Sequence, residues 1–236
     1  MLSVVTDEAA QVTERLTEDR VRLGRTSTAE RVAGILRERI TEGMFTPGTR
    51  LSEEAIGTAL GVSRNTLREA FRLLSHERLL VHELNRGVFV RRLTTEDVID
   101  LYHVRRLLEC WAIRQAGPLS EESLAGLREA VAVAESAAGE QRWEDVGTAN
   151  MRFHAAIVRL AGSPRLDETM GRLLAELRLA FLEMDNPHAF HEPYLVRNRE
   201  ILRLIEAGDT TGAERLLDDY LADAERQLVQ AHTSST

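Results

Sequence analysis

Residues 47–80 read PGTRLSEEAIGTALGVSRNTLREAFRLLSHERLL, and two capping serines divide this stretch into a pair of helices. Ser52 can cap a short helix that stops at Gly61. Ser63 can cap a longer helix, starting at Arg64, that buries apolar residues at helical spacing and leaves its arginines facing outward. Because only a few residues separate the two helices, the pattern predicts a helix-turn-helix.

The segments on both sides of this pair complete a larger unit. Ser27 and Glu30 form a capping box at the start of an amphipathic helix. Behind the helix pair, two extended runs flank a turn at residues 84–87, whose glycine can adopt the positive φ of a tight turn. This order is typical of a winged helix-turn-helix domain, which we place at residues 27–92. Its expected elements are helices over 27–43, 52–61 and 64–77 and strands over 80–83 and 88–91.

The charge of the chain is divided unevenly between its parts. Residues 27–92 carry a net charge of +3, whereas residues 93–236 carry −10, so only the first part suits a polyanion. The N-terminus of the third helix combines a positive dipole end with polar side chains, which favours entry into a DNA major groove. Arg86 at the hairpin tip can reach the adjacent backbone or minor groove. The alternative is a protein-binding module whose arginines only face solvent. The groove-facing side chains of the helix are Arg64, Asn65, Thr66 and, one turn on, Arg68.

Residues 47–80, followed by NRGVFV at 85–90, resemble the N-terminal domain of GntR-type bacterial transcription regulators. The shared motif has a Leu-x-Glu-Glu start, a Gly-Val-Ser-Arg turn, an Arg-Glu-Ala helix and a Gly-x-Phe-Val wing, and it covers about residues 28–92. Asn65 stands where many relatives have another small polar residue, so its base preference is open. The resemblance implies operator contacts by Ser63, Arg64, Thr66 and Arg68 from the recognition helix and by Arg86 and Gly87 from the wing.

Helix signals follow one another from Thr94 onward, and strand alternation is absent. Residues 93–236 are therefore predicted to form an all-α bundle of six to seven helices, and the chain is mainly α. The resemblance to GntR-type regulators implies that this bundle is the effector-binding and dimerisation domain. Residues 1–26 have little apolar spacing and are expected to be an arm that is partly disordered or helical. The expected helices lie over about 95–116, 121–137, 142–161, 164–185, 191–207 and 210–232.

Polar residues interrupt the apolar stripes of four of these helices. Burying such groups without partners costs about 1 to 3 kcal/mol each, so they must satisfy one another, hold water or line a pocket for a polar ligand. For any one of them a hydrogen-bonded core position is the simpler interpretation, whereas the set together favours a pocket. The inward-facing residues are Arg105, Asn150, His154, Asn198 and Tyr220.

The second half of the chain is similar to the FCD domain, the helical effector domain of the FadR-like branch, over residues 100–109, 149–166 and 198–221. Many members bind a divalent metal there through an Asp, a His four residues later and two further His. One imidazole, two carboxamides and a phenol replace that set here, and they lack its charge and donor strength. We therefore predict no tightly bound transition metal and no other cofactor. The corresponding residues are Asn150, His154, Asn198 and Tyr220.

Without a metal, the remaining groups can hold a small molecule directly. Arg105 suits a carboxylate or phosphate through two parallel hydrogen bonds, and His154 can add a pH-sensitive hydrogen bond. Glu109, one turn after Arg105, can instead neutralise it as an intrahelical pair. The expected effector is a small acidic metabolite. Two alternatives stay open: a ligand-free pocket used only for dimerisation, and an acyl-CoA sensor, because the branch includes metal-free members of that kind.

Composition excludes several other classes of protein. No apolar run approaches the roughly 20 residues of a membrane span, and Cys110 is the only cysteine, in keeping with a reducing compartment, so we expect a cytoplasmic protein. The inward-facing histidine has no nucleophile, carboxylate pair or glycine-rich phosphate loop beside it, which argues against an enzyme. We predict a homodimer that binds a palindromic double-stranded DNA operator as a repressor and responds to its effector by changing the placement of its two heads.

Overall fold

The expected winged helix-turn-helix is present in the computed structural model, which describes residues 27–117 and 119–234. The N-terminal arm expected at residues 1–26 lies outside the described residues. Ser27 caps the first helix through the expected capping box, in which its own N–H donates to the Glu30 carboxylate at 2.6 Å. Residues 27–92, called the head below, contain α2 (Thr28–Thr41), β1 (Arg50–Leu51), α3 (Glu53–Leu60), α4 (Arg64–His76), β2 (Leu80–Glu83) and β3 (Gly87–Val90).

The three strands of the head form a small antiparallel sheet in the order β1, β3, β2. Leu80 of β2 lies opposite Val90 of β3, and Leu51 of β1 lies opposite Val88 on the other side. All four side chains are buried, so the sheet closes one side of the head core. The sequence predicted the hairpin but missed β1, because a strand of two residues is too short to show alternation.

Six helices make up the rest of the described chain, in agreement with the predicted bundle. Thr94 and Ser120 cap two of them through hydrogen bonds from the backbone N–H three residues later. Ser163 precedes a third helix, but its side chain makes no such bond, and Pro164 occupies the first turn. The helices are α5 (Thr95–Gln115), α6 (Glu121–Gly139), α7 (Trp143–Arg159), α8 (Pro164–Leu182), α9 (Pro187–Glu206) and α10 (Thr210–Ser234).

Helix α9 begins four residues earlier than the sequence prediction, which placed its start near residue 191. Asn186 caps the helix, and a proline, which needs no hydrogen-bonded N–H there, fills its first position. Pro193 lies inside the helix and cannot donate to the Ala189 carbonyl. The Gln227 side chain of α10 donates to that carbonyl at 3.4 Å, which helps the helix continue past the proline.

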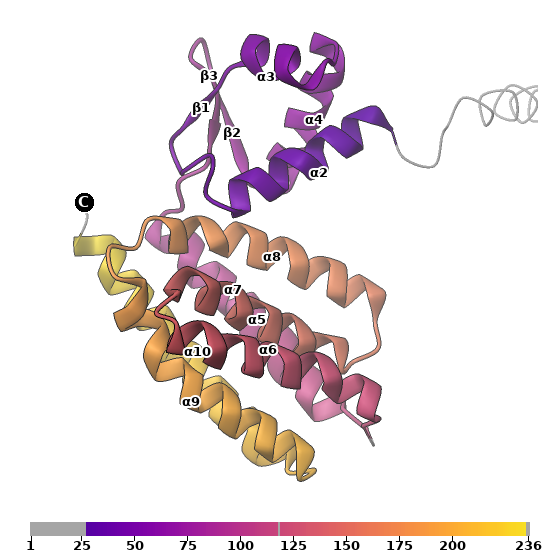
Figure 1. The fold of residues 1–236 in the computed structure, drawn as a ribbon, viewed down its shortest axis with the longest axis vertical. Coiled ribbons are helices and arrows are strands. Elements are labelled where there is room, and N and C mark those ends of the chain that lie inside the picture. Colours follow the sequence, from indigo (N-terminus) through magenta and orange to yellow (C-terminus); the bar gives the residue numbers. More distant parts are fainter. Residues whose placement is uncertain (1–26, 118, 235–236) are drawn as a thin grey trace, which may run out of the picture.

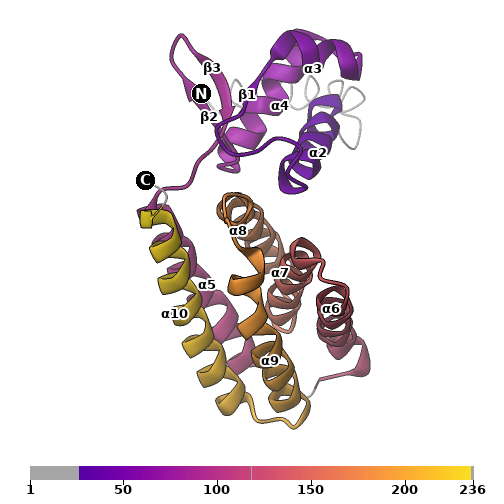
Figure 2. The same ribbon diagram turned by 60° about the vertical axis from the view of Figure 1, so that its left-hand side comes forward.

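Figures 1 and 2 show the head above the helical domain, with α8 directly beneath it. Helix α7 packs against α5, α6, α8 and α9 and is therefore the central helix of the domain. Its Phe153 and Ile157 are fully buried, and the polar residues on its inward face lie at the centre of the bundle. No helix in the part of the chain that the structure describes is long and apolar enough to cross a membrane.

Candidate nucleic-acid interface and helical-domain site

Helix α4 has one apolar face and one charged face, and this division determines what it presents to solvent. Leu67, Phe71 and Leu74 are buried against the head core. Arg64 and Arg68, on the opposite face, are exposed. The amphipathic pattern therefore anchors the helix by one side and leaves its N-terminal turn open to a partner.

The N-terminal turn of α4 carries the side chains predicted to contact DNA. The Ser63 hydroxyl accepts a hydrogen bond from the Thr66 N–H at 3.2 Å and lies 2.8 Å from the Thr66 hydroxyl, so both side chains take part in the cap. Arg64 and Asn65 are exposed, and neither side chain has a partner among the described residues. Arg68 differs, because its Nε donates to the Glu53 carboxylate of α3 at 2.9 Å. Arg64 and Asn65 are thus the polar groups of this turn that a ligand can engage without breaking a contact.

The tip of the β2–β3 hairpin, called the wing tip, carries an arginine. Arg86 pairs with Glu83 and lies over the Phe89 ring, 5.4 Å from its centroid. Gly87 has a φ of 114°, which residues with side chains rarely adopt. Arg50 of β1 passes close by, with its Nε 3.2 Å from where a Cβ of Gly87 would lie. The sequence carries no local signal for this exposed arginine, because β1 is too short to show strand alternation.

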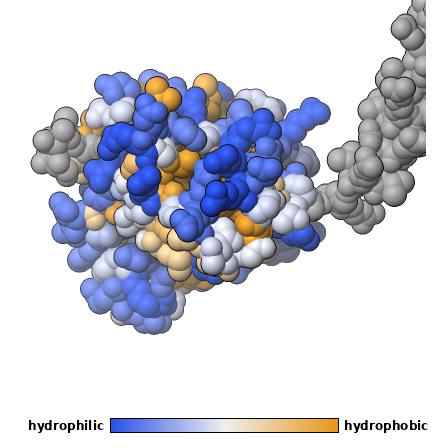
Figure 3. Space-filling model, turned by 90° about the horizontal axis from the view of Figure 1, so that it is seen from above, coloured by the Kyte–Doolittle hydropathy of each residue, from blue (hydrophilic) through white to orange (hydrophobic). Residues whose placement is uncertain are grey.

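The predicted DNA contacts therefore occupy two places on the head, the start of α4 and the tip of the β2–β3 hairpin. Figure 3 looks down on the head from above and shows that hydrophilic residues dominate this face. Because residues 27–92 also carry a net charge of +3, this face is suited to a polyanion such as the DNA backbone.

A network of buried charged and polar side chains lies at the centre of the helical domain. The Nε of Arg105 donates to Glu109 at 2.9 Å, and the other Glu109 oxygen lies 2.5 Å from Nδ1 of His154. None of the three side chains is more than 3% exposed. Arg105 also lies over the Tyr102 ring, 4.8 Å from its centroid. Of the two roles considered for Arg105, the structure adopts the pair with Glu109, so the guanidinium charge is already balanced.

The protonation states of Glu109 and His154 follow from their contacts. Although burial opposes ionisation, the Arg105 guanidinium and His154 hold the pKa of Glu109 below its ordinary value. Burial lowers the pKa of His154, against the attraction of the Glu109 carboxylate. His154 is therefore neutral at pH 7 and donates its Nδ1 proton to Glu109, which leaves Nε2 as an acceptor.

Asn150 is the centre of a second network that touches the first. Its Oδ1 accepts from Asn198 Nδ2 at 2.6 Å and from the Tyr220 hydroxyl at 2.9 Å. The Tyr220 ring lies 5.0 Å from the His154 ring, centroid to centroid. The structure thus brings all five residues of the predicted pocket together, from α5, α7, α9 and α10.

These groups do not fit a divalent transition metal. The Asn150 oxygen already accepts two hydrogen bonds, and burial raises the pKa of Tyr220 well above its ordinary value, so the phenol keeps its proton. Of the four family positions, only His154 supplies a strong donor atom. Within residues 27–117 and 119–234, no three His, Cys, Asp or Glu side chains are grouped to hold a metal ion. The chemistry of these donor atoms argues against a bound transition metal, and the absence of the metal stays a prediction.

Helix α8 connects the interior of the helical domain to the head. Arg178 of α8 is buried, and its Nε donates to the Thr41 carbonyl at the end of α2 at 3.0 Å. Arg91, which follows β3, pairs with Glu176 of α8 at 2.8 Å and with Asp97 of α5 at 2.6 Å. The two parts of the chain are therefore joined by charged side chains with low exposure, in addition to the linker between them.

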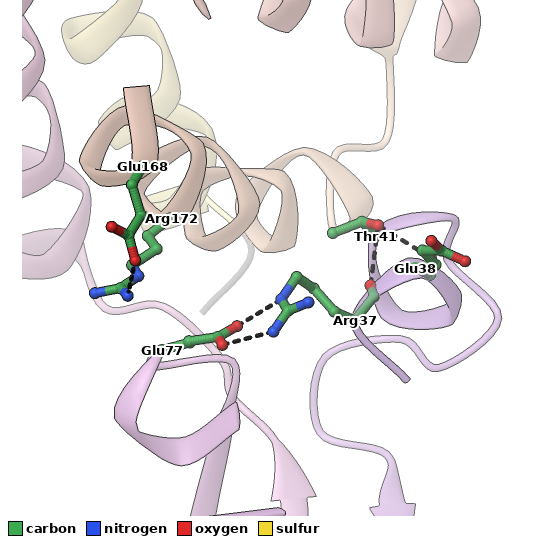
Figure 4. Close-up of polar contacts among 6 residues, drawn as sticks. All are labelled: Arg37, Glu38, Thr41, Glu77, Glu168 and Arg172. Atoms are coloured by element: carbon green, nitrogen blue, oxygen red, sulfur yellow. Dashed lines mark hydrogen bonds and ion pairs between the residues drawn. The ribbon is translucent and has the colours of Figure 1, made fainter. Parts of the chain in front are cut away.

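Figure 4 shows the side chains on both sides of this junction. Arg37 of α2 forms two hydrogen bonds of 2.6 Å with Glu77 at the end of α4, which ties α2 to α4. On α8, Arg172 pairs with Glu168. A crevice of about 270 Å³ lies between the end of α4 and helices α5 and α8. The head thus rests on α8 through a partly open, charged contact.

Comparison with known proteins supports both halves of this arrangement. Residues 28–90 match the family of bacterial regulatory proteins called the gntR family, and residues 100–223 match the FCD domain. The chain belongs to the GntR family of transcription regulators, with a C-terminal FCD domain, and its relatives are DNA-binding regulators and not enzymes.

Relatives with known names or structures cover most of the chain. It is 48% identical to a putative GntR transcriptional regulator from Rhodococcus sp. RHA1, whose crystal structure superposes with a TM-score of 0.83 over 87% of this chain and 99% of that one. It is 30% identical to a probable D-xylose utilization operon repressor from Paenarthrobacter nicotinovorans, over 85% of this chain and 88% of the relative. It is 32% identical to the gluconate operon repressor of Bacillus subtilis over 58% of this chain and 56% of the relative.

Proposed function

We propose that this regulator represses transcription by binding an operator through its head and releases the operator when a small molecule binds in the helical domain. The exposed N-terminal turn of α4, with Arg64 and Asn65 free of partners within the described chain, is the observation that carries the proposal. The names of the relatives, which include repressors of a D-xylose utilization operon and a gluconate operon, support the sign of the regulation.

The contacts of the head follow from the chemistry of its side chains. A guanidinium at Arg64 matches the two acceptors of guanine in the major groove, and a carboxamide at Asn65 matches adenine. Arg68 exchanges its surface pair with Glu53 for a phosphate, which is a small loss because exposed pairs contribute little. The remaining proposed contacts position the head on the backbone and come from Ser63, Thr66, Arg86 and Gly87, with Arg50 added from the structure.

The repressor acts as a homodimer on a palindromic operator. A single head offers one recognition helix and therefore reads only a few base pairs. Two heads related by a two-fold axis double the contacts and read the same sequence in each half-site. The spacing of the two heads then decides how well the dimer fits its operator.

Effector binding changes that spacing through α8. A ligand that contacts α7 and α9 favours one packing of the bundle, and α8 packs on α7. Because Arg178 holds the Thr41 carbonyl of the head, a shift of α8 reaches α2 directly. The effect on operator affinity equals the difference between the affinities of the ligand for the two arrangements.

A second function is favoured by one observation. Asn150, Asn198 and Tyr220 already satisfy part of one another's hydrogen bonding, as a filled core used only for dimerisation would. In that version the head still binds DNA, but no small molecule changes its affinity.

The test is operator binding by the full chain. We select binding sequences from a random DNA library and measure their affinity by fluorescence anisotropy for wild type, Arg64→Ala and Arg68→Ala. Arg172→Ala is the matched control, because Arg172 is equally exposed but lies on α8 in an intrahelical pair. We expect about tenfold weaker binding or more for Arg64→Ala, a smaller loss that shrinks at high salt for Arg68→Ala, and no change for the control.

The same assay separates the two versions of the helical domain. Failure to select any sequence, or equal affinity for all four proteins, contradicts the proposed head. Selected operators whose binding responds to no compound in a metabolite panel favour the filled core.

A further inference from the structure

Two buried polar atoms between α7 and α9 lack a hydrogen-bond partner in the described chain. Nε2 of His154 and Oδ1 of Asn198 are both buried and have no hydrogen-bond partner among the described residues. His154 is 1% exposed and Asn198 is 4% exposed, so bulk solvent does not satisfy them. A buried polar atom without a partner is unfavourable, and the positions of two such atoms in one cluster indicate where a ligand binds.

Both atoms are hydrogen-bond acceptors, and their neighbours determine this. The Nδ1–H of the neutral His154 donates a hydrogen bond to the Glu109 carboxylate, so Nε2 has only a lone pair. The Asn150 oxygen accepts hydrogen bonds from the Tyr220 hydroxyl and from Asn198 Nδ2, so the Oδ1 atom of Asn198 points away from Asn150. The cluster therefore calls for a ligand that donates hydrogen bonds.

The charge of the cluster determines which donor fits. Arg105 and Glu109 carry opposite charges, contact each other at 2.9 Å and are both buried, so the site as a whole is neutral. A carboxylate or an ammonium group brought here would be a buried charge without a partner, which is strongly unfavourable. A neutral hydroxyl group donates a hydrogen bond without adding charge.

The surroundings of the two acceptors suit a chain of several hydroxyl groups. His191 lies two turns before Asn198 on the same face of α9, and its buried Nδ1 also lacks a partner in the described chain. Gly147 stands in the equivalent place on α7, and its missing side chain lets His191 approach. The rings of Tyr194 and Tyr220, with centroids 4.4 Å apart, offer an apolar wall for carbon atoms between the hydroxyls.

We propose that the effector is a neutral polyhydroxyl compound, a polyol or sugar, and that its hydroxyl groups donate to His154 Nε2 and Asn198 Oδ1. The proposal rests on the proposed function, since it names the ligand of the same helical domain. It replaces the acidic metabolite expected from Arg105, because Glu109 already neutralises that guanidinium.

The experiment compares compounds of equal chain length that differ in charge. Purified full-length protein is tested by thermal shift and calorimetry with erythritol, xylitol and sorbitol, with the diacids succinate, glutarate and adipate, and with the diamines putrescine and cadaverine. We expect a stabilising shift from at least one polyol and none from its charged counterparts.

Two variants link binding to the proposed acceptors. Asn198→Leu removes the Oδ1 acceptor and should weaken polyol binding about tenfold, the effect of one lost hydrogen bond. His154→Phe removes Nε2 and should do the same. Arg203→Ala, on an exposed part of α9, is the control and should bind the polyol as wild type does. Circular dichroism and operator affinity show for each variant whether the fold and the head are intact.

The outcomes separate this inference from the proposed function. Polyol binding that Asn198→Leu weakens and Arg203→Ala does not supports the inference. Binding of a diacid in place of the polyol overturns it but leaves an effector-controlled regulator. No binding by any compound, with operator binding intact, overturns the ligand class, whereas loss of all operator binding by wild type contradicts the proposed function itself.

Discussion

Replacing Glu109 by Gln tests the charge balance at the centre of the helical domain. Glu109 is fully buried and contacts Arg105 with one oxygen and His154 with the other. The neutral amide leaves the buried guanidinium without a counter-charge, and it can turn its amino group toward the Nδ1 proton of His154. Breaking a buried ion pair from one side typically destabilises a protein by about 3 to 5 kcal/mol.

That loss is measurable by urea unfolding followed by circular dichroism at 222 nm and pH 7. For a chain of this size it corresponds to a fall in Tm of about 6 to 20 °C. Glu121→Gln is the matched control, because Glu121 pairs with Arg128 on the surface at 85% exposure and should change stability by less than about 1 kcal/mol. If Glu109→Gln and Glu121→Gln lose the same small amount, Glu109 does not hold a buried charge, and the neutral-site argument fails with it.

Three further predictions concern stability. Burial and the nearby Arg178 lower the pKa of His191 from 6.5 to about 4. The unfolded chain therefore binds a proton more readily, so about 3 kcal/mol of folding stability is present above pH 6.5 and is lost as the pH falls toward 4. His191→Phe should flatten this pH dependence in urea-unfolding measurements. Gly147→Ala places a Cβ 2.6 Å from His191 Nε2 and should lower the stability by about 1 to 3 kcal/mol. Gly171→Ala, at an exposed position of α8 where the new Cβ meets no other atom, should raise the stability by up to about 1 kcal/mol in the same assay. Ser63→Ala should destabilise the head by about 1 kcal/mol and Ser63→Gly by a few tenths, and equal losses would mean that the α4 cap is not formed.

The sequence predicted the head well because its signals are local. Ser27, Ser52 and Ser63 each mark a helix start within three residues, and the structure has a helix at each. Strand β1, which contains Arg50, was not predicted, because it forms by long-range pairing with β3 and its two residues are too few to show a strand pattern. The contact between Arg178 and Thr41 joins residues 137 positions apart, and no local pattern predicts it.

The polar cluster was predictable in membership but not in chemistry. Arg105, Asn150 and His154 interrupt apolar stripes, and such an interruption shows in the sequence. Which partner each group selects depends on distances across helices, so the choice between a free Arg105 and an Arg105–Glu109 pair needed the structure. His191 lies seven residues before Asn198 and shares its face of α9, a spacing that was present in the sequence even for a helix starting at 191.

The most direct test of the account is to repeat the selection of operator sequences with Asn65→Ala. If the start of α4 reads bases within a two-fold symmetric dimer, the variant should lose its preference at one base pair in each half-site, at positions related by symmetry, and keep the rest of the motif. An unchanged motif, or a uniform loss of affinity without loss of preference, would contradict base readout by this turn.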